Sequence, residues 1–544
     1  MTRAGRRPLF PIELRPKIGT VLREGYGLAA LRADALAGLT VAIVALPLSM
    51  AIAIASGVGP ERGLFTAIIG GFLVSLLSGS RYQVGGPAGA FIVLVATCVM
   101  QIGPEGLITA TFLCGFLLIA AGFLRIGSYI RFIPYPVTLA FTAGIGVVIL
   151  ASQLREMFGL TLPGDEPPAL IAKLGALWAA RETVTWWALV VAALSIAVIA
   201  GTRRLRPHWP GMLIAVVVAA LVTSLLGLPV ETIGSRFGAL PSLLPRPELP
   251  RLDPQSLLAA LPYAVSFALL GAIESLLSAV VADGMSGGRH RSNAELIGQG
   301  VANIGSALFG GFCVTGTIAR TATNVRAGSR GPVSGMLHAL WLLVFMLVAA
   351  PLAGYIPLAA LAGVLAVVAW GMVERAELWA LVRASRGDAL IVATTFLLVA
   401  FRDLTEGILA GFAIAGLVFI KRMSESAAPA EDAMPPADVS QSDERFVFRL
   451  HGPVFFGSAA QMGAVLERLA ERPRVFVLDM SEVPLIDSSG ARSLVLLARR
   501  VARRGGRLHI LGARREVRRV LLEHGLGRPE VRYVSRLQEP EGAE

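Results

Sequence analysis

The sequence predicts an all-α polytopic membrane protein of about fourteen spans, built as two inverted repeats of seven and followed by a small cytoplasmic α/β domain. Composition is the first reason, because 55% of the 544 residues are hydrophobic and only 16% are charged. Soluble domains hold about 25% charged residues. Apolar runs are the second reason, since stretches such as 36–58 and 338–372 are long enough to cross a bilayer once or twice.

The N-terminal arm, residues 1–32, is basic but lacks the continuous apolar core of a signal peptide, so we expect it to be retained. The formal net charge of +12 is interpreted as arginines that hold cytoplasmic loops against an anionic leaflet, and no nucleic-acid partner is predicted. Cys98, Cys114 and Cys313 lie in or beside apolar segments without ligand-like spacing. They are predicted to be core residues, with neither a disulfide nor a metal site.

Residues 33–423 are predicted to form the transmembrane domain. Lysine and arginine concentrate in alternate short loops, which predicts that both termini lie in the cytoplasm. The chain is expected to be a multi-pass protein of the inner membrane. The fourteen apolar segments lie at 36–58, 63–80, 87–102, 106–124, 134–153, 185–201, 209–228, 257–283, 295–311, 315–327, 333–352, 357–373, 388–402 and 405–421.

The composition changes after Arg422. Residues 424–444 are acidic and rich in proline, alanine and serine, which is typical of a linker. Residues 445–540 alternate between strand-like and helix-like patterns and so predict a compact α/β domain. Strands are expected at 445–451, 474–480 and 507–511, and helices at 458–471, 490–505 and 513–525.

Two segments of the membrane part look alike. Residues 81–97 and 309–325 each run from a short extended piece through glycines into a short helix. Each lies third in its group of seven, and because seven is odd the two groups have opposite topology. Short, glycine-interrupted segments at matching positions of two halves indicate the central site of a transporter. The alternative is that both are glycine-rich packing segments.

The two helix N-termini, near Ala88–Ala90 and Gly316–Ile318, are expected to face each other at mid-membrane, with Pro87 at the start of the first helix. Free amides and the positive ends of helix dipoles would attract an anion there. Arg320 lies about one turn into the second helix and would add positive potential. Arginine at the centre of a spanning helix costs about 2.5–3.5 kcal/mol, so it indicates a functional role.

Glu274 interrupts the apolar segment 257–283, and Ser278 lies one turn later on the same face. Because a carboxyl group in a low dielectric is costly to ionise, Glu274 is a candidate to take up and release a proton near neutrality. The alternative is a structural ion pair, with Arg320 as the candidate partner. Asp283, at the end of the same segment, is interpreted as a helix-end or loop-pairing residue.

These residues carry a resemblance to a known family. The stretches "GLTVAIVALPLSMAIA", "GGPAGAF", "GAIESLLSAVVADGMSGGRHRSNAELIGQGVANI" and "FGGFCVTGTIARTATNVRAGSRGPVSG" resemble the SulP family of anion transporters, to which sulfate permeases and prestin belong. The stretch "DMSEVPLIDSSGARSL" (479–494) resembles the STAS domain that follows the membrane part in that family. The resemblance covers roughly residues 30–540.

The resemblance implies a membrane part divided into a core and a gate domain, usually as a homodimer. It implies that the anion binds between the third and tenth spans and moves by an elevator-like shift of the core. Carried over by motif, the substrate site falls on Ala88, Gly89, Ala90, Gly316, Thr317 and Ile318, with Arg320 where many relatives also have arginine. The coupling site falls on Glu274, where bicarbonate transporters of the family have a sodium-binding aspartate, and on Ser278, where they have a threonine.

The chain departs from the family pattern in two places. It has Cys313-Val314-Thr315-Gly316 where many members have a proline in the extended piece, and Ala88 where a threonine is frequent. Both departures leave the identity of the anion open. Glutamate in place of aspartate at position 274 favours H⁺ over Na⁺ as the coupling ion, and no other cofactor is expected. Ser488 matches by motif a serine that is phosphorylated in bacterial STAS proteins of the anti-sigma-antagonist type. In transporters the same helix start often serves only as a fold feature, and regulation through a cytoplasmic partner is the alternative.

The sequence therefore predicts a proton-coupled secondary active transporter of small anions, with a sulfate-type dianion first. Sodium-coupled transport of bicarbonate or C4-dicarboxylates by the same fold is an alternative. Two others are a membrane-tethered STAS signalling module and an uncoupled channel or exchanger. No enzyme is predicted, because the six histidines are scattered and "GGPAGAF" lacks the lysine of a phosphate-binding loop.

Overall fold

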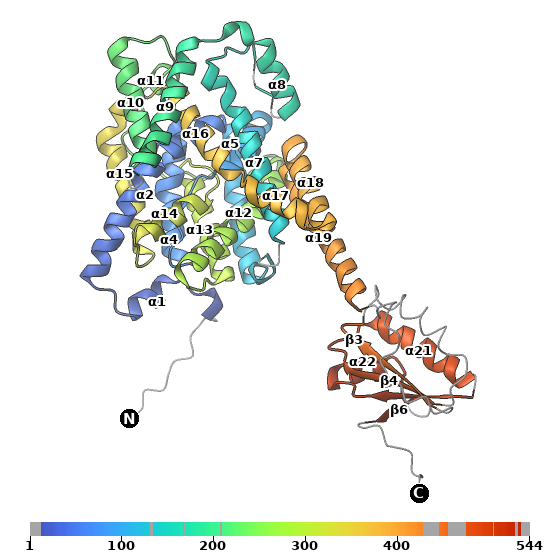
Figure 1. The fold of residues 1–544 in the computed structure, drawn as a ribbon. Coiled ribbons are helices and arrows are strands. Elements are labelled where there is room, and N and C mark those ends of the chain that lie inside the picture. Colours follow the sequence, from blue (N-terminus) through green and yellow to red (C-terminus); the bar gives the residue numbers. More distant parts are fainter. Residues whose placement is uncertain are drawn as a thin grey trace, which may run out of the picture. The chain divides into compact units, whose positions relative to one another are not determined.

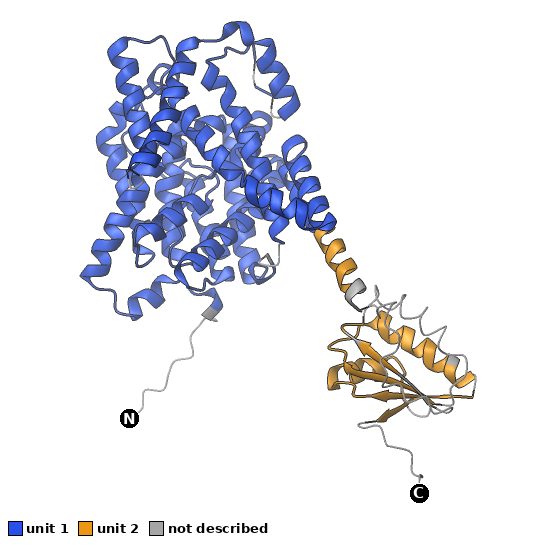
Figure 2. Cartoon of the chain, viewed as in Figure 1, with its two compact units in different colours: residues 1–412 blue, residues 413–544 orange. Residues whose placement is uncertain are grey.

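The computed structural model describes residues 12–130, 134–164, 166–167, 169–206, 209–427, 445–454, 475–503, 505–527 and 531–534. The chain divides into two compact units, Met1–Phe412 and Ala413–Glu544 (Figure 2), and each is described by itself. Most of the predicted linker and the predicted helix 458–471 lie outside the described residues.

The membrane part is helical (Figure 1). Its first half contains η1 (Ile12–Leu14), α1 (Ile18–Arg23), α2 (Leu28–Ala55), α3 (Pro60–Phe65), η2 (Thr66–Gly70), α4 (Gly71–Leu77), η3 (Gly89–Phe91), α5 (Ile92–Phe123), α6 (Gly127–Ile130), α7 (Tyr135–Phe158), α8 (Leu170–Ala179), η4 (Arg181–Thr183), α9 (Trp186–Leu205) and α10 (Gly211–Leu226). Then follow α11 (Ile233–Phe237), α12 (Pro254–Ser286), α13 (Ser292–Leu308), α14 (Ile318–Arg326), α15 (Val333–Ala353), α16 (Leu358–Met372), α17 (Arg375–Ala384), α18 (Arg386–Phe401) and α19 (Leu404–Ala427).

Each of the fourteen predicted apolar segments overlaps at least one helix, although segment 63–80 covers parts of α3, η2 and α4, and segment 315–327 begins with two strand residues. The third and fourth are joined in α5, which is interrupted at Gly103, where φ is 74°, just before Pro104. Within the described part of the chain, nine helices are long and apolar enough to cross a membrane, so the number fourteen stays a prediction. The predicted segments include no counterpart of α8 or α17, because ten residues are too few for a spanning run.

The helices of this unit pack as two groups. In the core group, α5 packs against α12 and α13, α2 packs against α15, and α14 packs against α12 and α2. In the gate group, α7 packs against α16 and α18, and α9 packs against α10 and α16. The groups meet where α2 contacts α16 and α10 and where η3 contacts α7. They correspond to the core and gate domains that the resemblance implies.

Two short strands cross inside the core group. β1 (Gly85–Gly86) pairs antiparallel with β2 (Thr315–Gly316), with Gly85 opposite Gly316 and Gly86 opposite Thr315. Because the strands are antiparallel, the chain leaves the pair in opposite directions. The helical segment η3–α5 and the helix α14 therefore start close together and run apart, as expected of the third and tenth spans of inverted repeats.

The second unit contains a four-stranded parallel sheet in the order β3 (Arg445–His451), β4 (Val475–Glu482), β5 (Arg507–Leu511) and β6 (Val531–Val534). The described helices are α21 (Ser488–Arg503) and α22 (Arg515–Glu523). The core contains Phe476 and Leu478 of β4, Leu494 of α21 and Leu521 of α22. Parallel strands need crossover connections, which explains the alternation of strand and helix patterns in the sequence. The predicted α/β domain is confirmed.

Candidate functional site

The third span begins next to the strand crossing. Ala88 caps the helix in an extended conformation (φ −117°, ψ 145°), and the first bond of η3 runs from the Phe91 N–H to the Ala88 carbonyl at 3.1 Å. The amides of Ala88, Gly89 and Ala90 have no hydrogen-bond partner among the described residues. Pro87 was predicted to start this helix, but it lies one residue before the cap. The helix start therefore carries free donors.

The tenth span begins on the other side of the crossing, with Thr317 as its cap (φ −102°, ψ 127°). The Gly316 N–H donates to Ser275 Oγ at 3.2 Å, and the Thr317 N–H donates to the Val84 carbonyl at 3.1 Å. These two amides are therefore occupied. Within the described chain, the amides without a partner at this tip belong to Ile318, Ala319 and Arg320. Of the three residues predicted here, only Ile318 offers a free donor.

Both helix starts border accessible space. Ala88 and Ala90 are 4% and 2% exposed, but Gly89 and Ile318 are partly exposed and Ala319 is exposed. The exposed side of α14 continues along the helix through Thr323 to Arg326. These positions recur at helical spacing, so they form one stripe. The stripe leads from the helix tip toward the end that carries Arg326, which the distribution of basic residues predicts to be cytoplasmic.

Arg320 is buried, with 2% of its surface exposed. Its Nη2 donates to Ser49 Oγ of α2 at 3.1 Å and to the Pro87 carbonyl at 3.3 Å, and its Nη1 donates to the Gly85 carbonyl at 3.4 Å. The guanidinium thus binds the extended piece of the third span. Among the described residues it forms no ion pair, so its charge adds to the positive potential of the two helix starts.

Two glycines of the crossing are required by close approach. A Cβ on Gly86 would lie 1.8 Å from Arg320 Nη1, and a Cβ on Gly316 would lie 1.6 Å from Gln83 Nε2. Real non-bonded contacts of a Cβ are about 3.4 Å or longer. Each of the two broken segments therefore packs a side chain directly against a glycine of the other one.

Glu274 lies on α12, which packs against α14 and β2. The described structure contains no ion pair between Glu274 and Arg320, so the pairing considered from the sequence is absent. The Glu274 side chain is partly exposed, whereas its Oε2 is buried without a hydrogen-bond partner. One carboxyl oxygen of Glu274 thus lacks a protein partner in the described structure, and proton binding by this residue stays a prediction.

The rest of the polar face of α12 joins the tenth span to the extended piece that precedes the third span. Ser278 Oγ donates to Thr321 Oγ1 at 3.1 Å, and Thr321 Oγ1 accepts the Val84 N–H at 3.2 Å. Ser275 Oγ lies 2.6 Å from Thr315 Oγ1, and the Ser275 carbonyl accepts from Gln83 Nε2 at 2.9 Å. Ser278 thus has a structural contact, while its role in coupling stays a prediction.

Sequence reasoning missed Gln83, Ser275 and Thr321. A signal for one of them existed, because Gly271, Ser275 and Ser278 recur at helical spacing in an otherwise apolar segment. Such a stripe of small and polar residues marks a face that packs closely against another backbone.

The gate group closes one side of the site. A Cβ on Gly89 would lie 2.9 Å from Ile149 Cδ1 of α7, so this isoleucine rests against the start of the third span. On the other side, Phe91 meets Phe267 of α12 edge to face, with ring centroids 6.0 Å apart. The paired helix starts therefore lie at the boundary between the core and gate groups.

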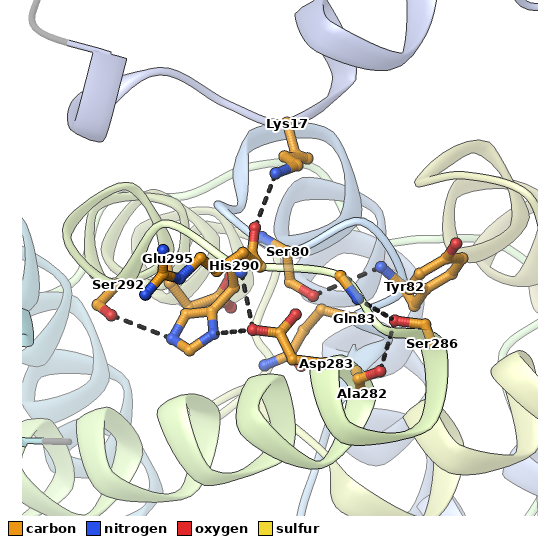
Figure 3. A network of polar contacts seen from close by, with 12 residues as sticks. Lys17, Ser80, Tyr82, Gln83, Ala282, Asp283, Ser286, His290, Ser292 and Glu295 are labelled. Carbon is orange, nitrogen blue, oxygen red and sulfur yellow. Dashed lines mark hydrogen bonds and ion pairs between the residues drawn. The ribbon is translucent and has the colours of Figure 1, made fainter.

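Asp283 pairs with the loop that follows α12, as predicted. Its Oδ2 accepts the His290 N–H at 2.8 Å and lies 2.7 Å from His290 Nδ1 (Figure 3). Lys17 Nζ donates to the Arg289 carbonyl at 2.7 Å, which joins the N-terminal segment to the same loop. Burial, together with the nearby Arg291 charge, lowers the pKa of Lys17. This network holds one end of the core group.

The remaining predicted residues have clear locations. Cys98, Cys114 and Cys313 are buried free thiols, which confirms them as core residues. In the described residues, no three His, Cys, Asp or Glu side chains gather as a metal-binding group. Ser488 is exposed at the first position of α21, after Asp487, whose Oδ1 accepts the Gly490 N–H at 2.7 Å. Its phosphorylation stays a prediction.

Comparison with known proteins identifies the type of chain. Residues 31–395 match the model of the sulfate permease family, and residues 436–532 match the STAS domain. The chain is 38% identical over 513 residues to "Putative sulfate transporter YvdB" of Bacillus subtilis (strain 168), covering 92% of this chain and 95% of that protein. It is 31% identical over 519 residues to the bicarbonate transporter BicA of Synechocystis sp., covering 90% of each.

Solved structures show the same fold. Murine Slc26a9, an anion transporter in the inward-facing state, superposes with a TM-score of 0.83 at 19% identity, covering 97% of this chain and 93% of that one. The transmembrane domain of a cyanobacterial bicarbonate transporter BicA superposes with a TM-score of 0.62 at 31% identity, covering 72% of this chain and 98% of that domain.

Proposed function

The chain belongs to the sulfate permease family, and on this premise we propose that it is a proton-coupled secondary active transporter of small anions, with a sulfate-type dianion as the first candidate. Members of such a family move solutes and do not transform them, so no catalytic residues are assigned. The proposal places the anion between the starts of the third and tenth spans.

One observation carries the proposal. Two helix N-termini with unpaired amides, at Ala88–Ala90 and at Ile318–Arg320, start beside one strand crossing inside a membrane unit and border accessible space. Unpaired amides and dipole ends at a helix start bind anions. The buried Arg320 guanidinium, which lacks a carboxylate partner in the described structure, adds positive charge. A packing role alone would not require this arrangement.

The same geometry supports an elevator-like mechanism. Both helix starts and Glu274 belong to the core group, whereas Ile149, which rests against Gly89, belongs to the gate group. A shift of the core along the gate would carry the complete anion site past Ile149 without breaking the β1–β2 pair. The exposed stripe on α14 supports a conformation that is open toward the cytoplasm.

Glu274 is proposed as the proton-binding residue. It lies on α12, which is hydrogen-bonded to the tenth span through Ser275 and Ser278 and to the extended piece of the third span through Gln83, and its buried Oε2 has no hydrogen-bond partner in the described structure. Ser278 is next to it on the helix but donates to Thr321. The transported anion itself is a proposal only, because relatives include proteins named for sulfate and for bicarbonate.

Transport by purified protein in liposomes tests the function. We expect acidification of the outside to accelerate sulfate uptake and a sodium gradient to have no effect. A panel with bicarbonate and C4-dicarboxylates identifies the preferred anion. Glu274→Gln is expected to remove the pH dependence, while Glu105→Gln, which changes an exposed carboxylate, should behave as the wild type. Sodium-driven uptake that ignores pH would contradict the coupling proposal, and full pH-independent transport by Glu274→Gln would indicate an uncoupled channel or exchanger.

Two variants separate transport from the signalling alternative. A membrane-tethered STAS module predicts that Ser488→Ala abolishes function and that Arg320→Ala does not; the transport proposal predicts the reverse. We further propose that the protein is a homodimer in the inner membrane with both termini in the cytoplasm. Cross-linking in membranes and accessibility of terminal tags from each side check these points.

A further inference from the structure

A cavity of about 490 Å³ lies between the core and gate groups. Its walls come from α2 and α5 of the core and from α7 and α16 of the gate, and Lys173 of α8 and Arg236 of α11 border it. The helices α8 and α11 lie at the end of the unit that is far from α1 and the N-terminus (Figure 1). The cavity is thus on the predicted outer side.

Helix α7 connects this cavity to the paired helix starts. Ile149 rests against Gly89, Ser152 and Gln153 line the cavity one turn further on, and Arg155 follows at its border. The cavity is therefore the outward continuation of the proposed anion path, and Ile149 separates it from the central site in this conformation.

Two carboxylates of the cavity are neutralised by close partners. Glu156 Oε1 lies 2.6 Å from Arg236 Nη1, and Glu166 Oε1 lies 2.9 Å from Lys173 Nζ. Burial opposes the charged form of Arg236, but the Glu156 carboxylate outweighs it and holds the Arg236 pKa above its ordinary value. Glu231, which lies 3.6 Å from Arg236, is exposed and does not line the cavity. Each of the two close pairs thus joins a carboxylate to a cation at the border of the cavity.

Arg155 also lines the cavity but belongs to neither of these two close ion pairs. Its nearest carboxylate oxygen is Glu156 Oε1 at 3.9 Å, and that oxygen already accepts from Arg236. Within the described chain the Arg155 guanidinium makes no side-chain hydrogen bond, and its side chain is 27% exposed. Facing walls are apolar, with Ile54 of α2 and Leu361 of α16. Low-dielectric walls strengthen the attraction of a charge for an anion.

We propose that this cavity is a second anion-binding site, at which Arg155 receives a small inorganic anion from the outside before the core carries it inward. The site rests on the proposed transport function and lies about two turns of α7 beyond the central one. Its guanidinium offers the paired donors that match the oxygens of sulfate or bicarbonate. Because the Arg236–Glu156 and Lys173–Glu166 pairs are closer, Arg155 keeps only the 3.9 Å contact with Glu156 among the carboxylates of the described residues.

Uptake of external sulfate by intact cells tests the site. Arg155→Gln is expected to raise the KM for external sulfate about tenfold with a Vmax within about twofold, which corresponds to about 1.4 kcal/mol. Arg155→Lys should recover most of the affinity because it restores the charge. Arg181→Gln is the matched control, since Arg181 is exposed on the same side and stacks on Trp178 outside the cavity. An unchanged KM in Arg155→Gln would overturn the inference.

A second measurement does not depend on transport. Ala55→Cys places a thiol in the cavity wall, while the three native cysteines are buried. We expect an anionic methanethiosulfonate reagent to modify it faster than a cationic one, and Arg155→Gln to lower this ratio at least about fivefold. A ratio unaffected by Arg155→Gln overturns the anion site even where the wild type transports. If Arg155→Gln lowers the ratio of the two modification rates but the wild type transports none of the tested anions, the proposed function is contradicted while the anion site is supported.

Discussion

Gly316 lies so close to a neighbouring side chain that even a methyl group cannot be added without displacing it. It pairs with Gly85 in the strand crossing, and the Gln83 side chain passes directly over it. In Gly316→Ala the new Cβ would lie 1.6 Å from Gln83 Nε2 and 2.3 Å from its Cδ. Backbone on both sides is held by hydrogen bonds, so the amide of Gln83 must move.

The cost follows from that displacement. An ordinary contact of about 3.5 Å requires the amide nitrogen to retreat by about 2 Å, which breaks its 2.9 Å hydrogen bond to the Ser275 carbonyl. A buried donor or acceptor left without a partner costs about 1–3 kcal/mol, and overpacking a dense site costs about 1–3 kcal/mol. Gly316→Ala should therefore destabilise the core group by about 2–6 kcal/mol and abolish most transport.

Thermal unfolding of the detergent-purified protein and sulfate uptake in liposomes measure the two effects. Gly175→Ala is the control, because a Cβ at this position of α8 meets nothing within 4 Å. A second variant isolates the cause: adding Gln83→Ala to Gly316→Ala removes the obstructing side chain. The double mutant should regain stability relative to Gly316→Ala, as a coupling between contacting residues requires.

Two outcomes would refute this reasoning. One is a Gly316→Ala protein that unfolds at the wild-type temperature and transports normally. The other is a double mutant whose stability is the simple sum of the two single mutants, which would show that Gln83 is not the obstacle.

Substitutions at two other residues test the charges. Arg320→Met leaves the Gly85 and Pro87 carbonyls without their donor, so it should lower the stability by about 1–3 kcal/mol and raise the KM for the anion. Arg320→Lys should restore the KM but not the stability. Uptake assays measure the KM, and thermal unfolding measures the stability. In the STAS domain, burial opposes ionisation of Asp479, but hydrogen bonds from Ser481 and Arg449 outweigh it and lower its pKa. Its contribution to stability is thus present above about pH 4 and is lost as the pH falls further, so Asp479→Asn should increase amide exchange in β4 at pH 7 and cause a smaller difference near pH 3.

The main features of the fold were predictable from the sequence because they depend on local patterns. Long apolar runs between charged loops gave the positions of the spanning helices, and the repeated glycine pattern gave the two broken segments. Gly103 and Pro104 are local signals for the break in α5, although α8 and α17 are too short to give one. The alternation of strand and helix patterns likewise predicted the α/β domain, whereas its identity as a STAS domain came from the resemblance of residues 479–494.

The details of the candidate site were less predictable because they depend on contacts between distant segments. That the amides of Gly316 and Thr317 are occupied follows from Ser275 and Val84, which lie far away in the sequence. Likewise, the direction of Arg320 depends on Ser49 of α2 and on the carbonyls of the opposite half. No periodicity within a single segment carries this information.

The separation of Arg320 from Glu274 limits how coupling can work. If the two formed an ion pair, a proton on Glu274 would free the arginine for the anion, but in the described structure Arg320 is held by Ser49 and two carbonyls. Its charge is therefore present in either protonation state of Glu274. An ionised Glu274 would lower the positive potential at the helix starts, because it lies on α12, whose Ser275 and Ser278 are hydrogen-bonded to Thr315, Gly316 and Thr321 of the tenth span. Under the proposed mechanism, we therefore expect a proton on Glu274 to favour the anion by removing a negative charge near the helix starts, and we expect Arg320 to supply a constant positive charge.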